Sequence, residues 1–257
     1  MAINVNLELT DHCNIKCPMC SQSMRKEAHG VPKRFMSWDS WKASLKGLEG
    51  MDEPVHLCPH WLGEPTIHPE FDAFVEYAFA LNPNRRLFSE FKLHTNAVVF
   101  SEKRSRLLTQ LANAPDTHPD CFRSIHFSID AFSTEAYKAV KGANKRERVF
   151  RNVENFLRVR QEMGFSRPYA HLAFVVQEAN AHEAHHFLNH WWAILGEMSI
   201  VPDLCWDWPH ENRDAIYFRP LNSGDQEASD ALHAKVCQDL GIHSGNGSQR
   251  IRAAESF

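Results

Sequence analysis

The sequence of 257 residues lacks any apolar run near the roughly 18 residues that a transmembrane helix needs. Its N-terminal segment has neither the cationic start nor the apolar stretch of a secretory signal peptide. An excess of basic residues is missing too, since 28 Lys and Arg stand against 32 Asp and Glu. That balance provides no broad cationic surface for nucleic acid or anionic membrane. We therefore expect a cytoplasmic protein that binds neither membrane nor nucleic acid.

Length and composition favour one large domain. Hydrophobic residues make up 43% of the chain, which is enough to bury a sizeable core. Charged residues make up 23%, an ordinary share for a folded domain. We expect this domain to span residues 1–240. Residues 241–257 are polar and contain Gly and Ser, so we expect a flexible C-terminal tail there.

Three of the seven cysteines, Cys13, Cys17 and Cys20, fall within eight residues near the N-terminus. An odd number of unevenly spread cysteines does not indicate a disulfide framework. Three thiolates spaced C-x3-C-x2-C are soft ligands that suit zinc or an iron–sulfur cluster. Three ligands instead of four leave one metal position open, as a reactive cluster requires. The alternative is a zinc site completed by His12 or His29.

Short apolar segments alternate with amphipathic helical patterns along the chain. The expected strands span residues 5–9, 54–57, 91–95, 124–129, 169–176 and 215–219. The expected helices span residues 37–48, 69–81, 101–112, 148–163, 180–195 and 225–240. This alternation predicts right-handed β-α-β crossovers and a parallel sheet. Because a closed eight-stranded barrel would need two further strands, we expect an α/β fold, a partial (β/α)6 TIM-like barrel.

Further motifs lie at the ends of successive strands. They are Gly63-Glu64-Pro65 after the second strand, Thr95-Asn96 at the third, Ser128-Ile129-Asp130 at the fourth and Gln177 at the fifth. Together with the cysteine segment after the first strand, this series resembles the radical S-adenosylmethionine (SAM) superfamily over nearly the whole chain. All these segments would meet at the carboxyl ends of parallel strands, where barrel folds assemble their sites.

The resemblance implies that Cys13, Cys17 and Cys20 hold one [4Fe–4S] cluster and that SAM chelates its fourth iron. It also implies that Glu64 and the neighbouring backbone receive the SAM amino group. The other candidates for cofactor binding are Met19, Gly63, Pro65, Thr95, Asn96, Ser128, Asp130, Lys141 and Gln177. Among these, Ser128 and Lys141 would hold the SAM carboxylate or ribose.

Several of these residues also have purely structural interpretations. Ser128 and Thr95 could cap strand ends, Asp130 could begin a turn, and Glu64 could form a surface salt bridge. The chain also departs from the family pattern at three positions, where Met19 replaces an aromatic residue and Leu62 and Ala97 replace glycines. The Met19 thioether could still pack on the adenine ring.

In this superfamily a reduced cluster passes one electron to SAM, which splits into methionine and a 5′-deoxyadenosyl radical. That radical takes a hydrogen atom from the substrate, here a peptide, a sugar or another small molecule. The last motifs resemble the branch that modifies peptides and sugars (SPASM/twitch-type), whose members usually carry a cysteine-rich C-terminal extension for auxiliary clusters. Cys237 has no partner cysteines after it, so we expect a single cluster. A one-electron donor such as flavodoxin or ferredoxin would complete the system.

With a single cluster, a redox-neutral outcome is more compatible than a net oxidation. A cysteine such as Cys58 or Cys205 could return a hydrogen atom to the substrate. Arg219, at the end of the last strand, would reach an anionic group of the substrate. The preceding Trp206 and Trp208 would close over the barrel mouth, either as a packed loop or as part of the substrate pocket.

Two functions of other classes remain open. His182, Glu183 and His186 satisfy H-E-x-x-H on an expected helix, the pattern of zinc-dependent hydrolases. The structural interpretation is a polar helix face. The second alternative is a non-catalytic iron–sulfur protein of the same fold.

Overall fold

The structure is a computed structural model that describes residues 2–20, 34–209 and 212–243. Its strands are parallel to their neighbours and form two groups, in the orders β1-β2-β3 and β4-β5-β6-β8-β7. The strands are β1 (Ile3–Asn6), β2 (Val55–Cys58), β3 (Glu90–Phe91), β4 (Leu93–Thr95), β5 (Ser124–Ser128), β6 (Tyr169–Val176), β7 (Asp203–Cys205) and β8 (Ala215–Pro220). Lys92 joins the two groups, and its backbone N–H donates to the carbonyl of Leu57 at 2.9 Å. The expected partial barrel of parallel strands is confirmed.

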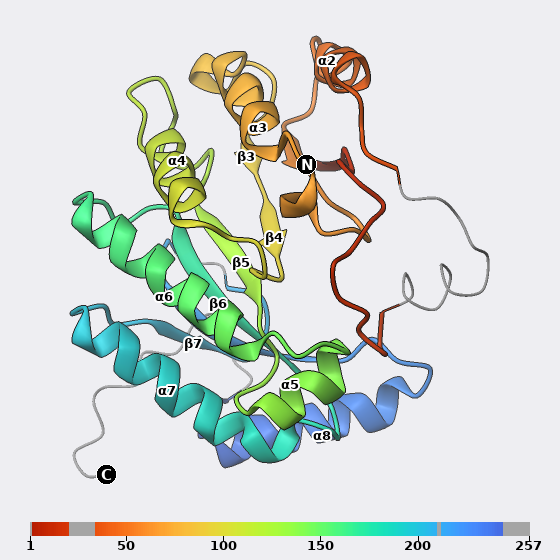
Figure 1. Ribbon diagram of the computed structural model, residues 1–257, viewed down its shortest axis with the longest axis vertical. Coiled ribbons are helices and arrows are strands. Elements are labelled where there is room, and N and C mark those ends of the chain that lie inside the picture. The colour runs from red at the N-terminus through yellow and green to blue at the C-terminus, as the bar shows by residue number, and fades with distance from the viewer. Residues whose placement is uncertain (1, 21–33, 210–211, 244–257) are drawn as a thin grey trace.

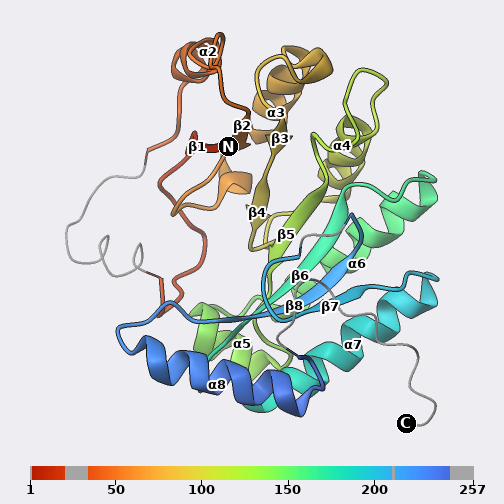
Figure 2. The ribbon, with the colours of Figure 1, turned by 180° about the vertical axis from the view of Figure 1, so that it is seen from behind.

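Helices connect the strands and cover one face of the sheet. They are α2 (Trp38–Lys46), α3 (Phe71–Ala80), α4 (Glu102–Ala112), α5 (Thr134–Lys141), α6 (Arg146–Glu162), α7 (Ala184–Glu197) and α8 (Gln226–Asp239), with short 3-10 turns η1 (Pro65–Ile67), η2 (Pro83–Arg85) and η3 (Ala181–Glu183). Figure 1 shows α4, α6 and α7 in a row in front of the strands, and Figure 2 shows the opposite, helix-free face of β5, β6 and β8. None of the helices in the described ranges has both the length and the apolar character that a bilayer span requires.

The hydrophobic core lies between the helices and the sheet. In β5, Ile125 and Phe127 are fully buried, and the Phe127 ring packs against Phe156 of α6 at 5.2 Å between centroids. The residues that alternate with them, Ser124 and His126, point to the other side of the sheet, as the two-residue period of a strand requires. The helices therefore take the apolar face of each strand and leave a polar face inside the barrel.

Two elements were not expected from the sequence. Strand β7 lies at the edge of the sheet beside β8, within a segment expected to be a loop, and α5 fills the connection after β5. The expected strand 91–95 is divided at Lys92, because β3 pairs with β2 whereas β4 pairs with β5. The expected first strand was placed too late, since β1 ends at Asn6.

The helix expected over residues 180–195 begins later in the structure, since α7 starts at Ala184. Asn180 and Glu183 resemble a capping box, but Asn180 has no side-chain capping bond to the following turn. Its amide instead donates to the carbonyl of Asp130 at 2.7 Å. At the start of the expected tail, Ile242 is buried and its N–H donates to the carbonyl of Cys237. Residues 244–257 of the expected tail lie outside the described residues.

Candidate active site

Cys13, Cys17 and Cys20 lie in the loop after β1, and all three are free and half-buried. The N–H of Cys20 donates to the carbonyl of Cys17 at 3.0 Å. Burial raises the pKa of Cys13 to about 12 and also raises the pKa of Cys17, and nearby cysteines add to both shifts. The Lys141 ammonium opposes the shift at Cys17. Neighbouring buried thiols can serve as thiolate ligands once a cationic metal centre offsets their negative charge.

The cysteine segment fits a cluster better than a single zinc ion. No group of three or more His, Cys, Asp or Glu side chains within the described ranges is placed to hold one metal ion. A [4Fe–4S] cluster demands less convergence, because its cysteines bind separate irons. His12, one candidate for a fourth zinc ligand, is buried and stacks on Phe35 at 5.5 Å between ring centroids. His29, the other candidate, lies outside the described residues.

Two glycines allow the backbone around the cysteine loop to pack closely. A Cβ atom at Gly63 would lie 1.9 Å from the carbonyl oxygen of Thr10. A Cβ atom at Gly142 would lie 2.0 Å from the carbonyl oxygen of Lys16. Gly142 also has a φ of +62° and ends α5 as a left-handed cap. The cysteine loop is therefore held between the Gly63 segment and the end of α5.

Glu8 binds the segment in which Leu62 replaces a glycine of the family pattern. One carboxylate oxygen of Glu8 accepts the backbone N–H groups of Leu62 and Gly63, each at 2.7 Å. Pro65 follows as the first residue of η1. With Leu62 in place of the glycine, the backbone N–H groups of both Leu62 and Gly63 still have a hydrogen-bond acceptor.

The Glu64 carboxylate gathers donors from two strand ends. Its Oε1 accepts the hydroxyl groups of Thr66 at 2.5 Å and Thr95 at 2.7 Å. Its Oε2 accepts the backbone N–H of Asn96 at 2.7 Å. Burial raises the pKa of Glu64, and these hydrogen bonds oppose the rise. The surface salt bridge considered for Glu64 is wrong, because the residue is only 3% exposed.

Asn96 connects this cluster to the cysteine loop. Its side-chain amide donates to Asn14 Oδ1 at 2.8 Å and to the Cys13 sulfur at 3.5 Å. At the end of β4, Thr95 therefore contacts Glu64, and Asn96 contacts both Glu64 and the cysteine segment. Cys13, Glu64, Thr95 and Asn96 are four of the residues that the sequence proposed for the same site.

Ser128, Asp130 and Lys141 form a second buried cluster. Lys141 makes an ion pair with Asp130 and donates to the Ser128 hydroxyl at 2.8 Å. Asp130 also accepts the backbone N–H of Val175 at 2.8 Å, which ties the end of β5 to β6. Burial lowers the pKa of Lys141, but the Asp130 charge outweighs it and the pKa lies above its ordinary value. Lys141 is thus a fixed cation near Cys17.

The remaining two cofactor candidates are Gln177 and Met19. Gln177 lies just beyond β6, and its backbone N–H donates to Asn180 Oδ1 at 2.7 Å. Met19 is half-buried within the cysteine segment. Both lie on segments that follow strand ends, as the sequence predicted.

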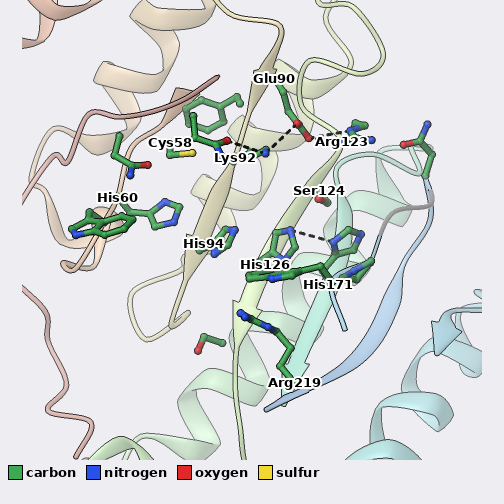
Figure 3. A pocket seen from close by; sticks show the side chains of 18 of the residues that line it. Cys58, His60, Glu90, Lys92, His94, Arg123, Ser124, His126, His171 and Arg219 are labelled. Carbon is green, nitrogen blue, oxygen red and sulfur yellow. Dashed lines mark hydrogen bonds and ion pairs between the residues drawn. The ribbon is translucent and has the colours of Figure 1, made fainter. Parts of the chain in front are cut away.

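A cavity of about 880 Å³ occupies the inside of the barrel (Figure 3). Residues of nearly every strand line it, together with the segment between β7 and β8. The lining residues are Asn4, Asn6, Cys58, His60, Trp61, Glu90, Phe91, Lys92, His94, Arg123, Ser124, His126, Ser128, His171, Trp208, Pro209, Asn212, Arg219 and Asn222. Ser128 belongs to both this pocket and the Lys141 cluster, so the pocket adjoins the segments proposed for cofactor binding.

The two cysteines proposed as hydrogen-atom donors differ in their position relative to the pocket. Cys58, at the end of β2, lines the pocket, and burial raises the pKa of its thiol. Cys205 is buried among Ala173, Ala215 and Tyr217, and it is not among the lining residues. Only Cys58 is therefore placed to meet a molecule inside the barrel.

Arg219 and Trp208 meet at the pocket wall. The Arg219 guanidinium lies 4.0 Å from the centroid of the Trp208 ring, and its Nε donates to Asp207 at 3.2 Å. Of the two tryptophans expected near the barrel mouth, Trp208 lines the pocket, whereas Trp206 packs against His233.

A wall of four histidines is the main feature that the sequence analysis missed. His94, His126 and His171 are direct register partners on β4, β5 and β6, and His60 stacks on His94 at 4.5 Å between centroids. Burial holds the pKa of every one of them below the ordinary value, at about 4 for His60 and about 3 for His171. The signal was a histidine at an inward position of each of the strands β4, β5 and β6.

The H-E-x-x-H segment does not form the zinc site of a hydrolase. His182 lies in η3 and is 70% exposed, whereas α7 begins only at Ala184. The Glu183 carboxylate accepts the backbone N–H groups of Phe132 and Ser133, each at 3.0 Å, and so fixes the start of α5. This alternative function is wrong, because the segment performs a structural task.

Comparison with curated proteins finds two relatives. The chain is 21% identical over 215 residues to the tungsten-containing aldehyde ferredoxin oxidoreductase cofactor-modifying protein of Pyrococcus furiosus, covering 82% of this chain and 54% of that protein. It is 31% identical over 81 residues to the S-adenosylmethionine-dependent nucleotide dehydratase of Selenomonas ruminantium, covering 31% and 26%. The chain thus spans little more than half the length of the Pyrococcus furiosus protein.

Two solved structures share the fold. "Native anSMEcpe with bound AdoMet" matches 93% of this chain and 60% of its own, with a TM-score of 0.61 and 14% identity. Methylornithine synthase (PylB) matches 92% and 62%, with a TM-score of 0.51 and 10% identity. The sequence model of the radical SAM superfamily matches residues 7–171. The chain therefore belongs to the radical SAM superfamily, whose enzymes use a [4Fe–4S] cluster and SAM.

Proposed function

We propose that this chain holds one [4Fe–4S] cluster through Cys13, Cys17 and Cys20, binds SAM beside it, and removes a hydrogen atom from a substrate in the barrel pocket. When bound, the reduced cluster and SAM supply a 5′-deoxyadenosyl radical. The protein supplies the ligands, the orientation of both molecules and a cavity that keeps the reaction away from solvent. An external one-electron donor of the flavodoxin or ferredoxin class would reduce the cluster.

The main observation that supports the proposal is the link from Cys13 through Asn96 to Glu64. Asn96 donates its amide to the Cys13 sulfur and its backbone N–H to Glu64. A carboxylate held one residue away from a cluster ligand is suitably placed for the SAM ammonium group. On the other side of the loop, Lys141 and Ser128 offer donors for the SAM carboxylate or ribose. Met19, Gly63, Pro65, Thr95, Asp130 and Gln177 would complete the binding surface.

The pocket supports the second half of the proposal. It adjoins Ser128 and presents Arg219 to an anionic group of the substrate. If a cysteine returns the hydrogen atom, we propose Cys58, which lines the pocket, over Cys205, which does not. The sulfur–hydrogen bond would break as the substrate carbon–hydrogen bond forms. The external one-electron donor and a solvent proton would then restore the thiol.

Anaerobic reconstitution followed by measurement of 5′-deoxyadenosine tests the proposed function. The protein is given SAM and a strong reductant, and Cys17→Ala is compared with Cys121→Ala, which alters a buried cysteine of the core. We expect 5′-deoxyadenosine from the wild type and from Cys121→Ala, and none from Cys17→Ala. A reconstituted protein that holds zinc and no iron or sulfide would contradict the proposal. A cluster that survives in Cys17→Ala with unchanged product would contradict the ligand assignment.

A further inference from the structure

The charge of the pocket differs in sign from that of the chain. Three cations line the pocket, Lys92, Arg123 and Arg219, whereas Glu90 is the one carboxylate among the lining residues of the described ranges. Glu90 lies 2.7 Å from Arg123 and 3.7 Å from Lys92, so one carboxylate serves two cations. Asp207 offsets Arg219 from outside the lining. An excess of positive charge remains inside a chain whose formal net charge is −4.

The four histidines of the wall do not change the net charge of the pocket at pH 7, because their lowered pKa values keep them neutral. Burial is the main cause that lowers the pKa of His94 and His126, and the neighbouring histidines, Lys92 and, at His94, Arg219 lower it further. A molecule that carries a negative charge is attracted by Lys92, Arg123 and Arg219, whereas a cation is repelled by them. The electrostatics of the pocket therefore favour an anion.

Hydrogen bonding divides the wall into a bonded half and an open half. His171 Nε2 lies 3.2 Å from the carbonyl of Arg213, which can only accept, so this nitrogen carries the proton. His171 Nδ1 then accepts from His126 Nε2 at 3.3 Å, and His126 Nδ1 accepts from the Tyr217 hydroxyl at 3.1 Å. This half of the wall is bonded within the protein.

At the other end of the wall, Nδ1 of His60 is buried and has no hydrogen-bond partner among the described residues. His60 and the stacked His94 both line the pocket. A buried polar atom without a partner is costly unless a ligand or water bonds it. Beside the cations, the pocket thus offers imidazole groups to the polar atoms of a bound molecule.

We infer that the pocket selects a small anionic molecule, which the positive charges of Lys92, Arg123 and Arg219 attract and whose polar groups bond His60 and His94. The cavity of about 880 Å³ suits a small-molecule ligand. The inference rests on the proposed function, since it names the class of substrate for the same site. A neutral peptide is the competing occupant.

Cys58 is a natural reporter of this field, because its thiol lines the pocket. The cluster-loaded protein, without reductant, is treated with an anionic sulfonatoethyl methanethiosulfonate or with a cationic trimethylammonioethyl methanethiosulfonate. Mass spectrometry then gives the labelling rate at Cys58. With each rate divided by the rate of the same reagent with a free thiol, we expect the anionic reagent to react about tenfold faster than the cationic one. The ratio of the two rates cancels changes in the thiolate fraction of Cys58, so it reports the charge around the pocket.

Lys92→Gln and Arg219→Gln should each lower this ratio severalfold. Arg86→Gln is the matched control, because Arg86 pairs with Glu49 on the surface and lies outside the pocket. A ratio at or below one would overturn the inference, as would a ratio that neither pocket variant changes. Failure of both reagents to reach Cys58 would also overturn it, because the cavity would not admit small molecules. This assay needs no SAM cleavage, so its failure is distinct from a failure to form 5′-deoxyadenosine.

Discussion

The α-carbon of Gly142 lies against the carbonyl of Lys16, so closely that a Cβ at Gly142 would stand 2.0 Å from that oxygen. Lys16 directly precedes Cys17, and Gly142 directly follows Lys141. This contact therefore fixes the cysteine loop against the end of α5. No side chain larger than hydrogen fits at position 142 without moving the loop.

Gly142→Ala should lower cluster incorporation while most of the fold persists. The Cβ would push the Lys16 carbonyl away and displace Cys17, and the left-handed φ of +62° adds strain. Gly164→Ala is the matched control, since Gly164 has a φ of +75° but nothing within 4 Å of the added Cβ. Iron and sulfide per chain after reconstitution give the measure, with circular dichroism for the fold. Equal iron content in the two variants would contradict the role of this contact.

The Lys141–Asp130 ion pair leads to a prediction about stability. Both side chains are almost fully buried, so Asp130→Asn would leave the Lys141 charge unpaired and should cost about 3–5 kcal/mol in the free energy of unfolding. Asp130→Asn combined with Lys141→Met removes both charges and should cost less than the single change. Denaturant unfolding measures both. Glu49→Gln, which breaks a surface pair with Arg86, should cost about 1 kcal/mol or less. A double variant less stable than Asp130→Asn would contradict this account.

The histidine wall predicts acid sensitivity in a window above the titration of most carboxylates. The folded-state pKa of His60 is about 4 and that of His171 about 3, below the ordinary value of 6.5. The unfolded chain therefore binds more protons as pH falls below about 6.5, and each neutral imidazole costs about 1.4 kcal/mol per pH unit. Stability should be complete above pH 6.5 and decrease towards pH 5.

Thermal unfolding at pH 7.0, 6.0 and 5.0 measures this loss. His94→Gln should reduce the slope of the melting temperature against pH, because it removes one buried imidazole. His182→Gln is the control, since His182 is 70% exposed and should leave the slope unchanged. A melting temperature that is constant from pH 7 to pH 5 would show that the wall does not stay neutral.

The sequence predicted what depends on local pattern and missed what depends on register. The spacing of Cys13, Cys17 and Cys20 and the motif around Glu64 are contiguous, so both could be identified without a structure. The histidine wall depends on His94, His126 and His171 being register partners, which no single strand reveals. The Glu183 carboxylate bonds the backbone N–H groups of Phe132 and Ser133 before α5 instead of capping its own helix. This contact joins segments far apart in the sequence, so no local pattern reveals it.

Glu64→Gln tests the carboxylate itself. The Glu64 oxygens accept bonds from Thr66, Thr95 and Asn96, and an amide offers only one accepting oxygen to these donors. The –NH2 group would face at least one donor, so we expect a loss of about 1–3 kcal/mol in stability. The SAM ammonium would also lose its counter-charge, so SAM affinity should fall by about tenfold or more.

Glu70→Gln is the matched control for this change. The Glu70 carboxylate accepts an exposed hydrogen bond from the Trp38 indole, and it does not bond the Thr66, Thr95 and Asn96 donors that Glu64 accepts. Equilibrium binding of SAM to the reconstituted protein separates the two effects, because it is measured at a temperature where both variants stay folded. If Glu64→Gln loses stability but binds SAM as tightly as Glu70→Gln, the carboxylate is a structural acceptor that orders Thr95 and Asn96. If SAM binding falls in Glu64→Gln alone, the same carboxylate both orders the strand ends and receives the cofactor.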